Sequence, residues 1–193
     1  MCLFNFCCRR LSDIASQVFM MKEDVRSTSG SLSGSSPVTS SVWVPPLPGS
    51  FKINVDAAFY STTKEACLSL VVRDHQGLPH LCAATRVNNV DSALHAEFKA
   101  ILFGLTKASK FQFLSVLLES DSLIAIKEIK KQISFCEWEG IISDVIDMSS
   151  KFQSCSFYHV RRVANICAHN LAKLAYELGV CKVWRVFMAP KFL

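Results

Sequence analysis

The sequence predicts an α/β fold, built on a mixed five-stranded sheet with helices on both faces. Three strand-like segments follow one another between residues 51 and 86, and beyond residue 90 segments with helical spacing alternate with two more strand-like segments. The predicted order is therefore βββαβααβα. Because a strand that follows a crossover helix favours parallel pairing, we expect an antiparallel meander that continues into parallel strands.

The predicted domain occupies residues 50–180, and three further segments flank it. Residues 1–25 contain helix-compatible stretches but are too short to build a core of their own. Residues 26–49 are rich in serine and proline, which is typical of a linker, and they end in an extended lead-in. Residues 181–193 are a C-terminal tail in this division of the chain.

The first three strands are predicted from alternation and turn chemistry. Apolar residues alternate from Phe51 onward, which places Asp56 on the opposite face of the first strand. Leu68–Arg73 and Leu78–Arg86 are the next two strands, and Asp74–Gly77 between them has the composition of a turn. Together these strands make the antiparallel meander.

The remaining elements are predicted from helical spacing and from polar residues that can cap helices. They are a helix capped by Asp91 or Ser92 that runs to Ala108, a strand at Phe113–Leu118, a helix capped by Asp121 or Ser122 that runs to Lys131, a helix at Trp138–Ser149, a strand at Cys155–Val160, and a helix capped by Asn165 that runs to Leu178. In such sheets functional residues gather at the carboxyl ends of the strands.

Composition favours a soluble intracellular protein, with the nucleus or the cytosol as its compartment. The nine cysteines include no CxxC pair, so they indicate neither a zinc ribbon nor a disulfide framework. Four thiols are expected to be buried: Cys67, Cys82, Cys155 and Cys167. No apolar run reaches the ~20 residues of a membrane span. The formal charge is +5, but residues 50–181 hold 14 basic and 13 acidic side chains, so charge alone argues weakly for nucleic-acid binding.

Three acidic residues are the candidate catalytic and metal-binding group. Leu94 and Ile101 place Glu97 on the apolar stripe of its helix, where a carboxylate needs a partner or a metal. Asp56 and Asp121 become neighbours if the first and fourth strands pair in parallel. Converging carboxylates repel one another unless cations hold them together, and hard oxygen ligands select Mg²⁺ or Mn²⁺.

Each of the three residues also has a simpler interpretation. Asp121 precedes Ser122 at a helix start, so it can be an N-cap and nothing more. Asp56 can pair with a lysine, and Glu97 can pair with an arginine. Only the joint placement of all three favours a site for a pair of ions that activates water for phosphodiester cleavage.

Five motifs in order then resemble a known family. They are Lys52–Phe59, Val72–Gly77, Ala96–Glu97, Glu119–Ser122 and Asn165–Lys173. They closely resemble the plant reverse-transcriptase-like branch of type 1 ribonuclease H domains. This resemblance implies a ribonuclease H-like fold that cleaves the RNA strand of an RNA–DNA hybrid, with four carboxylates that hold two Mg²⁺ ions. Three of these carboxylates correspond to Asp56, Glu97 and Asp121.

His169 departs from the family pattern at the fourth position. The family pattern Asn-x-x-Ala-Asp-x-Leu-Ala implies an aspartate there, and this chain has His169. A neutral imidazole supplies one nitrogen and no negative charge, so we expect reduced activity that favours Mn²⁺. The alternatives are a surface histidine with no role, a noncatalytic nucleic-acid-binding or protein-interaction module derived from a retroelement, and a decaying fragment.

The expected partner is nucleic acid, most of all an RNA–DNA hybrid, bound by a monomer. Residues beside the acidic group are candidates for contacts to sugar or phosphate: Asn54, Ser120, Ser122 and Asn165. Basic residues that can neutralise the backbone are Lys127, Lys130, Lys131, Arg161 and Arg162. A solvated surface role is an equal alternative for each of them.

Overall fold

The computed structural model describes residues 42–131, 137–179 and 181–185. The expectations for residues 1–25 and most of those for 26–49 lie outside this part of the chain. The elements, in chain order, are β1 (Phe51–Tyr60), β2 (Glu65–Arg73), β3 (Pro79–Val87), α2 (Ala93–Lys110), β4 (Ser115–Ser120), α3 (Leu123–Lys131), α4 (Glu139–Ser149), β5 (Ser154–His159), the 3-10 helix η2 (Arg162–Asn165), α5 (Ile166–Glu177) and β6 (Lys182–Arg185).

The sheet has the strand order β5-β4-β1-β2-β3-β6. β1, β2 and β3 pair antiparallel, whereas β4 pairs parallel to β1 and β5 pairs parallel to β4. The predicted mixed sheet of five strands is therefore confirmed. The short strand β6 adds a sixth member at the β3 edge, in the segment expected to be a tail, where its backbone pairs antiparallel to β3.

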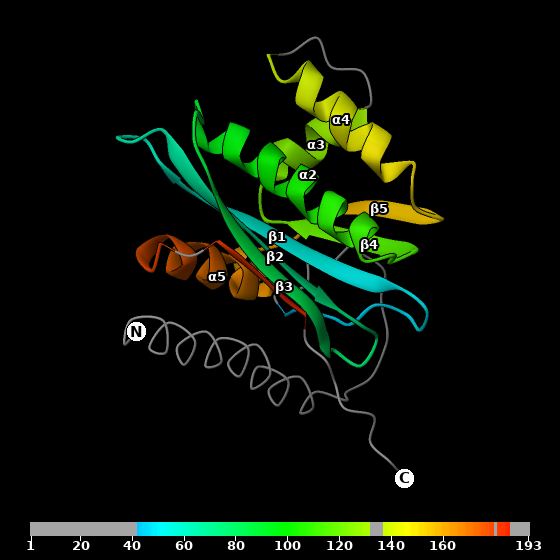
Figure 1. Cartoon of the computed structure of the whole chain (residues 1–193). Coiled ribbons are helices and arrows are strands. Elements are labelled where there is room, and N and C mark those ends of the chain that lie inside the picture. The colour runs from blue at the N-terminus through cyan, green and yellow to red at the C-terminus, as the bar shows by residue number, and fades with distance from the viewer. Residues whose placement is uncertain (1–41, 132–136, 180, 186–193) are drawn as a thin grey trace.

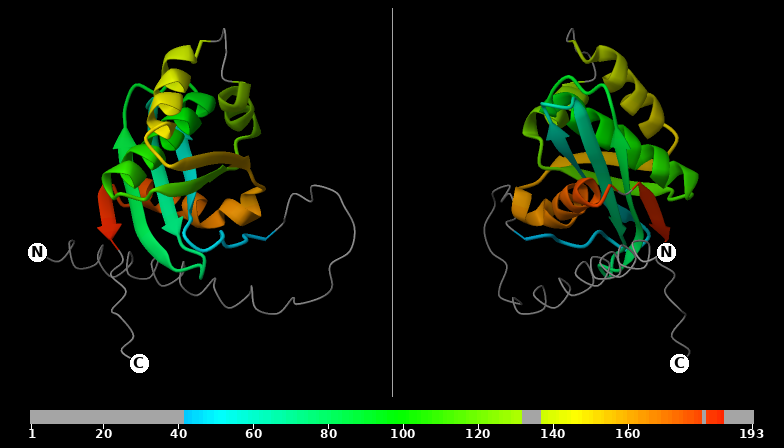
Figure 2. Two further views of the ribbon diagram at one scale, coloured as in Figure 1. Left: turned by 90° about the vertical axis from the view of Figure 1, so that its right-hand side faces the viewer. Right: turned by 60° about the vertical axis from the view of Figure 1, so that its left-hand side comes forward.

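Helices cover both faces of the sheet, as predicted. α2 packs on β1 and β2, and α3 and α4 pack against α2. α5 packs on the opposite face of the sheet, against the same two strands (Figures 1 and 2). The main core lies beneath α2. A smaller cluster lies beneath α5 and includes Cys67, Cys82 and Cys167, which are buried as predicted, whereas Cys155 is only half-buried.

Gly104 allows α2 to approach β1 closely. A Cβ built at this position would lie 2.6 Å from Cγ1 of Val55, which is far inside van der Waals contact. Any larger residue would therefore push the helix away from the strand. Since α2 carries Glu97 and β1 carries Asp56, this close contact also sets the distance between two candidate site residues.

Ser92 and Ser122 cap their helices, and Asn165 does not. The Ser92 hydroxyl accepts from the backbone of His95 over 3.1 Å, and the Ser122 hydroxyl accepts from that of Ala125 over 3.4 Å. Asn165 stands at the N-cap position of α5, but its side chain makes no capping hydrogen bond. The prediction that it caps the helix is wrong, because η2 precedes α5 and the amide turns into the core instead.

The end of the predicted linker packs on the domain. Trp43 stacks on Arg73, with the guanidinium carbon 3.6 Å from the ring centroid, and Lys52 Nζ donates to the carbonyl of Val44 over 2.6 Å. The described structure therefore packs residues as early as Trp43 on the domain, several residues before Phe51. Within the described residues, no helix has the length and apolar character needed to cross a membrane.

Candidate acidic site

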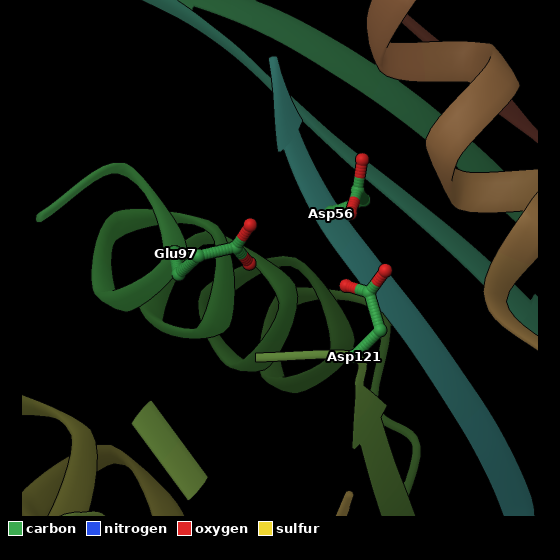
Figure 3. Close-up of side chains that lie close together, drawn as sticks. All are labelled: Asp56, Glu97 and Asp121. Carbon is green, nitrogen blue, oxygen red and sulfur yellow. The ribbon is translucent and has the colours of Figure 1, made fainter. Parts of the chain in front are cut away.

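Three carboxylates from separate elements converge at the end of β4. Asp56 lies in β1, Glu97 in α2 and Asp121 directly after β4, and their side chains point toward one another (Figure 3). One oxygen of each lies within 4.8 Å of the others. The parallel register explains the meeting of the two aspartates: Asn54 is opposite Glu119, so Asp56 in β1 and Asp121, just past the end of β4, both follow two residues later.

The site is strongly acidic, with Asp56 buried and Glu97 and Asp121 half-buried. Asp56 is 1% exposed, and neither Asp56 Oδ1 nor Glu97 Oε2 has a hydrogen-bond partner among the described residues. Burial, and then the charge of Asp121, raise the pKa of Asp56 to about 8. Burial, followed by the charges of Asp56 and Asp121, raises the pKa of Glu97 well above its ordinary value. Three carboxylates in this space repel one another when they are ionised, and a cation would remove that repulsion.

His169 and Arg162 complete the immediate surroundings. His169 Nδ1 lies 3.0 Å from Asp56 Oδ2, so the structure places the histidine beside the acidic group, which it joins only through Asp56. Arg162 donates from Nε to Asp121 Oδ2 over 2.9 Å, and its Nη1 lies 3.1 Å from His169 Nε2. Burial and the charges of Arg162 and Lys173 lower the pKa of His169, which favours the neutral imidazole. With the proton on Nδ1, the ring donates to Asp56 Oδ2 and accepts from Arg162 at Nε2, and we assign the tautomer from these two hydrogen bonds.

A buried polar network lies beneath the site on the α5 face. Asn54 donates to Glu119 over 2.9 Å and to Asn165 over 3.2 Å, and it accepts from Arg73 over 2.7 Å. Lys52 closes the network with an ion pair to Glu119 at 2.7 Å. Apart from Arg73 Nε, which has no partner in the described structure, these groups pair with one another away from water, and they position β1, β4 and the start of α5.

Three of the four residues predicted to contact the substrate are buried in this structure. Asn54, Ser120 and Asn165 are each 0% exposed, so their contacts with sugar or phosphate stay predictions. The Ser120 hydroxyl accepts from the backbone of Ser122, and a hydrogen bond between Ser120 and Glu97 favours the charged form of that carboxyl. Ser122 is half-buried and caps α3. The motif positions beside the acidic residues therefore support the site from within.

Sequence reasoning did not anticipate two features of the site. Arg162 was considered only for the nucleic-acid backbone, yet it pairs with Asp121 and contacts His169. Glu119 is 6% exposed and paired with Lys52, although it stands only two residues before Asp121. Alternation along β4 contained the signal for Glu119, because a strand residue two positions before a site residue shares its face. No local signal marks the pairing of Arg162, which depends on how η2 lies against the end of β4.

The three carboxylates suit a hard divalent cation. All their potential ligand atoms are oxygens, which Mg²⁺ and Mn²⁺ prefer. The two unpartnered oxygens of Asp56 and Glu97 are the strongest sign of such a site, since a buried acceptor without a donor is costly. A bound ion would act as a Lewis acid and would lower the pKa of a coordinated water.

Solved structures share this fold at low sequence identity. RNase H1 from the archaeon Halobacterium salinarum NRC-1 superposes with a TM-score of 0.62 at 20% identity, over 66% of this chain and 98% of that one. The N-terminal RNase H domain of a Mycobacterium tuberculosis protein gives 0.60 at 17%, over 66% and 94%. LC11-RNase H1, isolated from compost by a metagenomic approach, gives 0.60 at 15%, over 67% and 98%, in its complex with an RNA/DNA hybrid.

The family is shown by the sequence match. No curated protein matches the chain. A family model described as Reverse transcriptase-like matches residues 54–175, which include the three carboxylates and His169. With a ribonuclease H-like sheet in the order 3-2-1-4-5 and an acidic group at the end of β4, the chain belongs to the reverse transcriptase-like family of ribonuclease H-like domains.

Proposed function

We propose that the domain is a metal-dependent nuclease that cleaves the RNA strand of RNA–DNA hybrids, with an activity lowered by His169. One observation carries the proposal: Asp56, Glu97 and Asp121 converge, and two of their buried oxygens have no partner in the described structure. A buried acidic group of this kind has no use in packing, because it destabilises the metal-free fold. Its geometry is useful only when it holds cations.

The choice of substrate rests on similarity to proteins of the same fold. The structure of LC11-RNase H1 has been solved with an RNA/DNA hybrid. The match covers 98% of LC11-RNase H1 and 67% of this chain. Mg²⁺, or Mn²⁺ in its place, would supply the Lewis acid and the activated water. The chain itself would hold the ion with the three carboxylates and orient Asp56 through the hydrogen bond from His169.

His169 is the reason to expect weak activity. The imidazole contributes no negative charge at a position where the family pattern implies a carboxylate, so the site has one charge fewer to balance two divalent ions. Mg²⁺ demands near-ideal octahedral geometry and gives up its water ligands reluctantly, so a site that lacks one carboxylate disfavours it relative to Mn²⁺. The proposal therefore includes a preference for Mn²⁺.

Cleavage of a labelled RNA–DNA hybrid tests the proposal. The wild type is assayed with Mg²⁺ and with Mn²⁺, beside Asp56→Asn and His169→Asp, and beside single-stranded RNA and duplex DNA as substrates. We expect slow cleavage of the hybrid that is faster with Mn²⁺, is lost in Asp56→Asn and increases in His169→Asp. If the protein binds the hybrid but shows no cleavage that depends on Asp56, the proposed nuclease activity is contradicted.

That contradictory result would support the second candidate, a noncatalytic nucleic-acid-binding module derived from a retroelement. The observation in its favour is the ion pair of Arg162 with Asp121, which neutralises one carboxylate without a metal. A titration of the same hybrid in the absence of divalent ions separates the two candidates. The module would bind equally well with and without the metal, whereas the enzyme would bind more tightly with it.

We also propose that the protein is a monomer of the nucleus or the cytosol. The five cysteines in the described residues form no disulfide with one another, which suits a reducing compartment. Size-exclusion chromatography with light scattering checks the monomer, and imaging of a tagged full chain checks the compartment. A stable dimer, or a tag found in the secretory pathway, would contradict this part.

A further inference from the structure

Arg162 places an exposed cation over a buried carboxylate. Its Nε lies 2.9 Å from Asp121 Oδ2, and its Nη1 lies 3.0 and 3.1 Å from the two ring nitrogens of His169. The arginine side chain is 58% exposed, whereas the Asp121 side chain is 6% exposed. The Arg162 guanidinium therefore covers the site from the solvent side and contacts both His169 and Asp121.

This placement puts Arg162 in competition with a metal ion. Asp121 uses one of its two oxygens for the guanidinium, and a divalent ion among the three carboxylates needs an oxygen from the same residue. Two cations close to one carboxylate also repel each other. An exposed side chain at the start of a short 3-10 helix can turn into solvent without disturbing the core, so the conflict is resolved most easily by movement of Arg162.

We propose that Arg162 is the resident counter-ion of the acidic site: it neutralises Asp121 when no metal is bound, and once a metal displaces it, it binds a phosphate of the substrate. The second half of the proposal rests on the proposed function, and the first half does not. A planar guanidinium donates two parallel hydrogen bonds to a phosphate, which suits it to this second partner.

Neighbouring basic residues lack this arrangement and provide controls. Arg161 is exposed, stands beside Arg162 in the chain, and makes no side-chain contact with the acidic group that the structure records. Lys173 is also exposed and lies one helical turn beyond His169. Only Arg162 bridges Asp121 and His169 within the described chain. A variant of Arg161 thus changes the net charge by the same amount without removing a contact to the site.

Binding of Mn²⁺ alone tests the counter-ion. Calorimetric titration compares the wild type with Arg162→Gln, Arg162→Lys and Arg161→Gln, and thermal melts establish that each variant is folded. We expect Arg162→Gln to bind Mn²⁺ roughly tenfold more tightly, since one positive charge near the ion is removed. Arg162→Lys and Arg161→Gln should stay near the wild type. Equal or weaker Mn²⁺ binding by folded Arg162→Gln would overturn the proposal.

Binding of a labelled RNA–DNA hybrid tests the second partner. The titration uses Ca²⁺ as the divalent ion, with gels to check that the RNA strand stays intact, and it is repeated with EDTA. We expect Arg162→Gln to bind the hybrid several-fold more weakly with Ca²⁺ and to match the wild type with EDTA, where Arg162 is held by Asp121. An unchanged affinity with Ca²⁺ would overturn the phosphate contact. A wild type that binds no hybrid at all would instead overturn the proposed function, and the Mn²⁺ titration would still stand.

Discussion

The side-chain amide of Asn165 donates a hydrogen bond to the backbone carbonyl of Val55 over 2.8 Å. The registered pairs of β1 and β4 end at Asn54 and Glu119, so the Val55 carbonyl lies just past that ladder. Asn165 thereby ties the start of α5 to the strand residue that precedes Asp56. His169, one helical turn later, is held against the acidic group by the same attachment.

Replacement of Asn165 by alanine should destabilise the fold. The change removes the donor to Val55 and the acceptor for Asn54, both inside a fully buried network, and we expect a loss of about 1–3 kcal/mol in the free energy of unfolding. Urea denaturation measures it. Asn165→Asp, which retains an acceptor for Asn54 and loses the donor, is the matched control and should lose stability too. A change within about 0.5 kcal/mol for Asn165→Ala would show that the network contributes little.

Alanine at two helical glycines should have opposite effects. At Gly104 the new Cβ would meet Val55 at 2.6 Å, so Gly104→Ala is expected to cost about 1–3 kcal/mol through overpacking. At Gly140 in α4 nothing lies within 4 Å of the added Cβ. Gly140→Ala should therefore stabilise the fold by roughly 0.5–1 kcal/mol, because alanine lowers the backbone entropy of the unfolded chain. Chemical denaturation of both variants checks the pair. A stabilised Gly104→Ala would contradict the close packing of α2 on β1.

The stability of the metal-free protein should fall as pH rises through the range set by Asp56. Its pKa is about 8 in the folded chain against an ordinary 3.8, so between these values the unfolded chain has released a proton that the folded chain retains. Stability therefore declines from about pH 4 to pH 8 and levels off above that. The raised pKa of Glu97 adds to the decline in the same direction.

Thermal melts from pH 5 to 8 measure this dependence. With EDTA, the melting temperature of the wild type should fall by roughly 5 °C more than that of Asp56→Asn, which lacks the titrating group. Excess Mn²⁺ should remove most of the difference, because a bound cation keeps the carboxylates ionised in the folded state. Parallel curves for the wild type and Asp56→Asn would contradict the raised pKa.

Loss of Lys52 should be among the most damaging single changes. Lys52 and Glu119 are 8% and 6% exposed, and Lys52→Met leaves the glutamate charge buried without its cation. We expect a loss of about 3–5 kcal/mol in urea denaturation. The double variant Lys52→Met with Glu119→Gln removes both charges and should recover part of that loss. A double variant less stable than Lys52→Met alone would argue against an unpaired charge as the cause.

Local pattern was sufficient to predict most of the fold. Alternation from Phe51 and helical spacing around Glu97 depend only on residues a few positions apart in the chain. Both elements formed where they were expected. The parallel pairing of the first and fourth strands followed from the order of the elements, and it brought Asp56 beside Asp121. The strand β6 was missed, because so short an edge strand exists only through its pairing with β3.

Burial of polar residues was decided by the tertiary structure. Asn54, Ser120 and Asn165 stand beside the acidic residues in the sequence, and nothing in their local pattern distinguishes a surface contact from a buried support. Packing of α5 against β1 buried Asn54 and Asn165, which bond to each other, whereas Ser120 is buried on the opposite face of the sheet, beside Glu97 of α2. A hydrogen bond between residues 111 positions apart depends on the whole path of the chain between them.

The sequence by itself determined which acidic residues are present, on which strands and helix they lie, and that a histidine stands at the fourth position. Only the tertiary structure decided that His169 bonds to Asp56 and that Arg162 pairs with Asp121. The physical reason is the distance along the chain over which each effect acts. Periodicity and capping are local and can be read along the chain, whereas the partners of a charge depend on which distant segments exclude water around it.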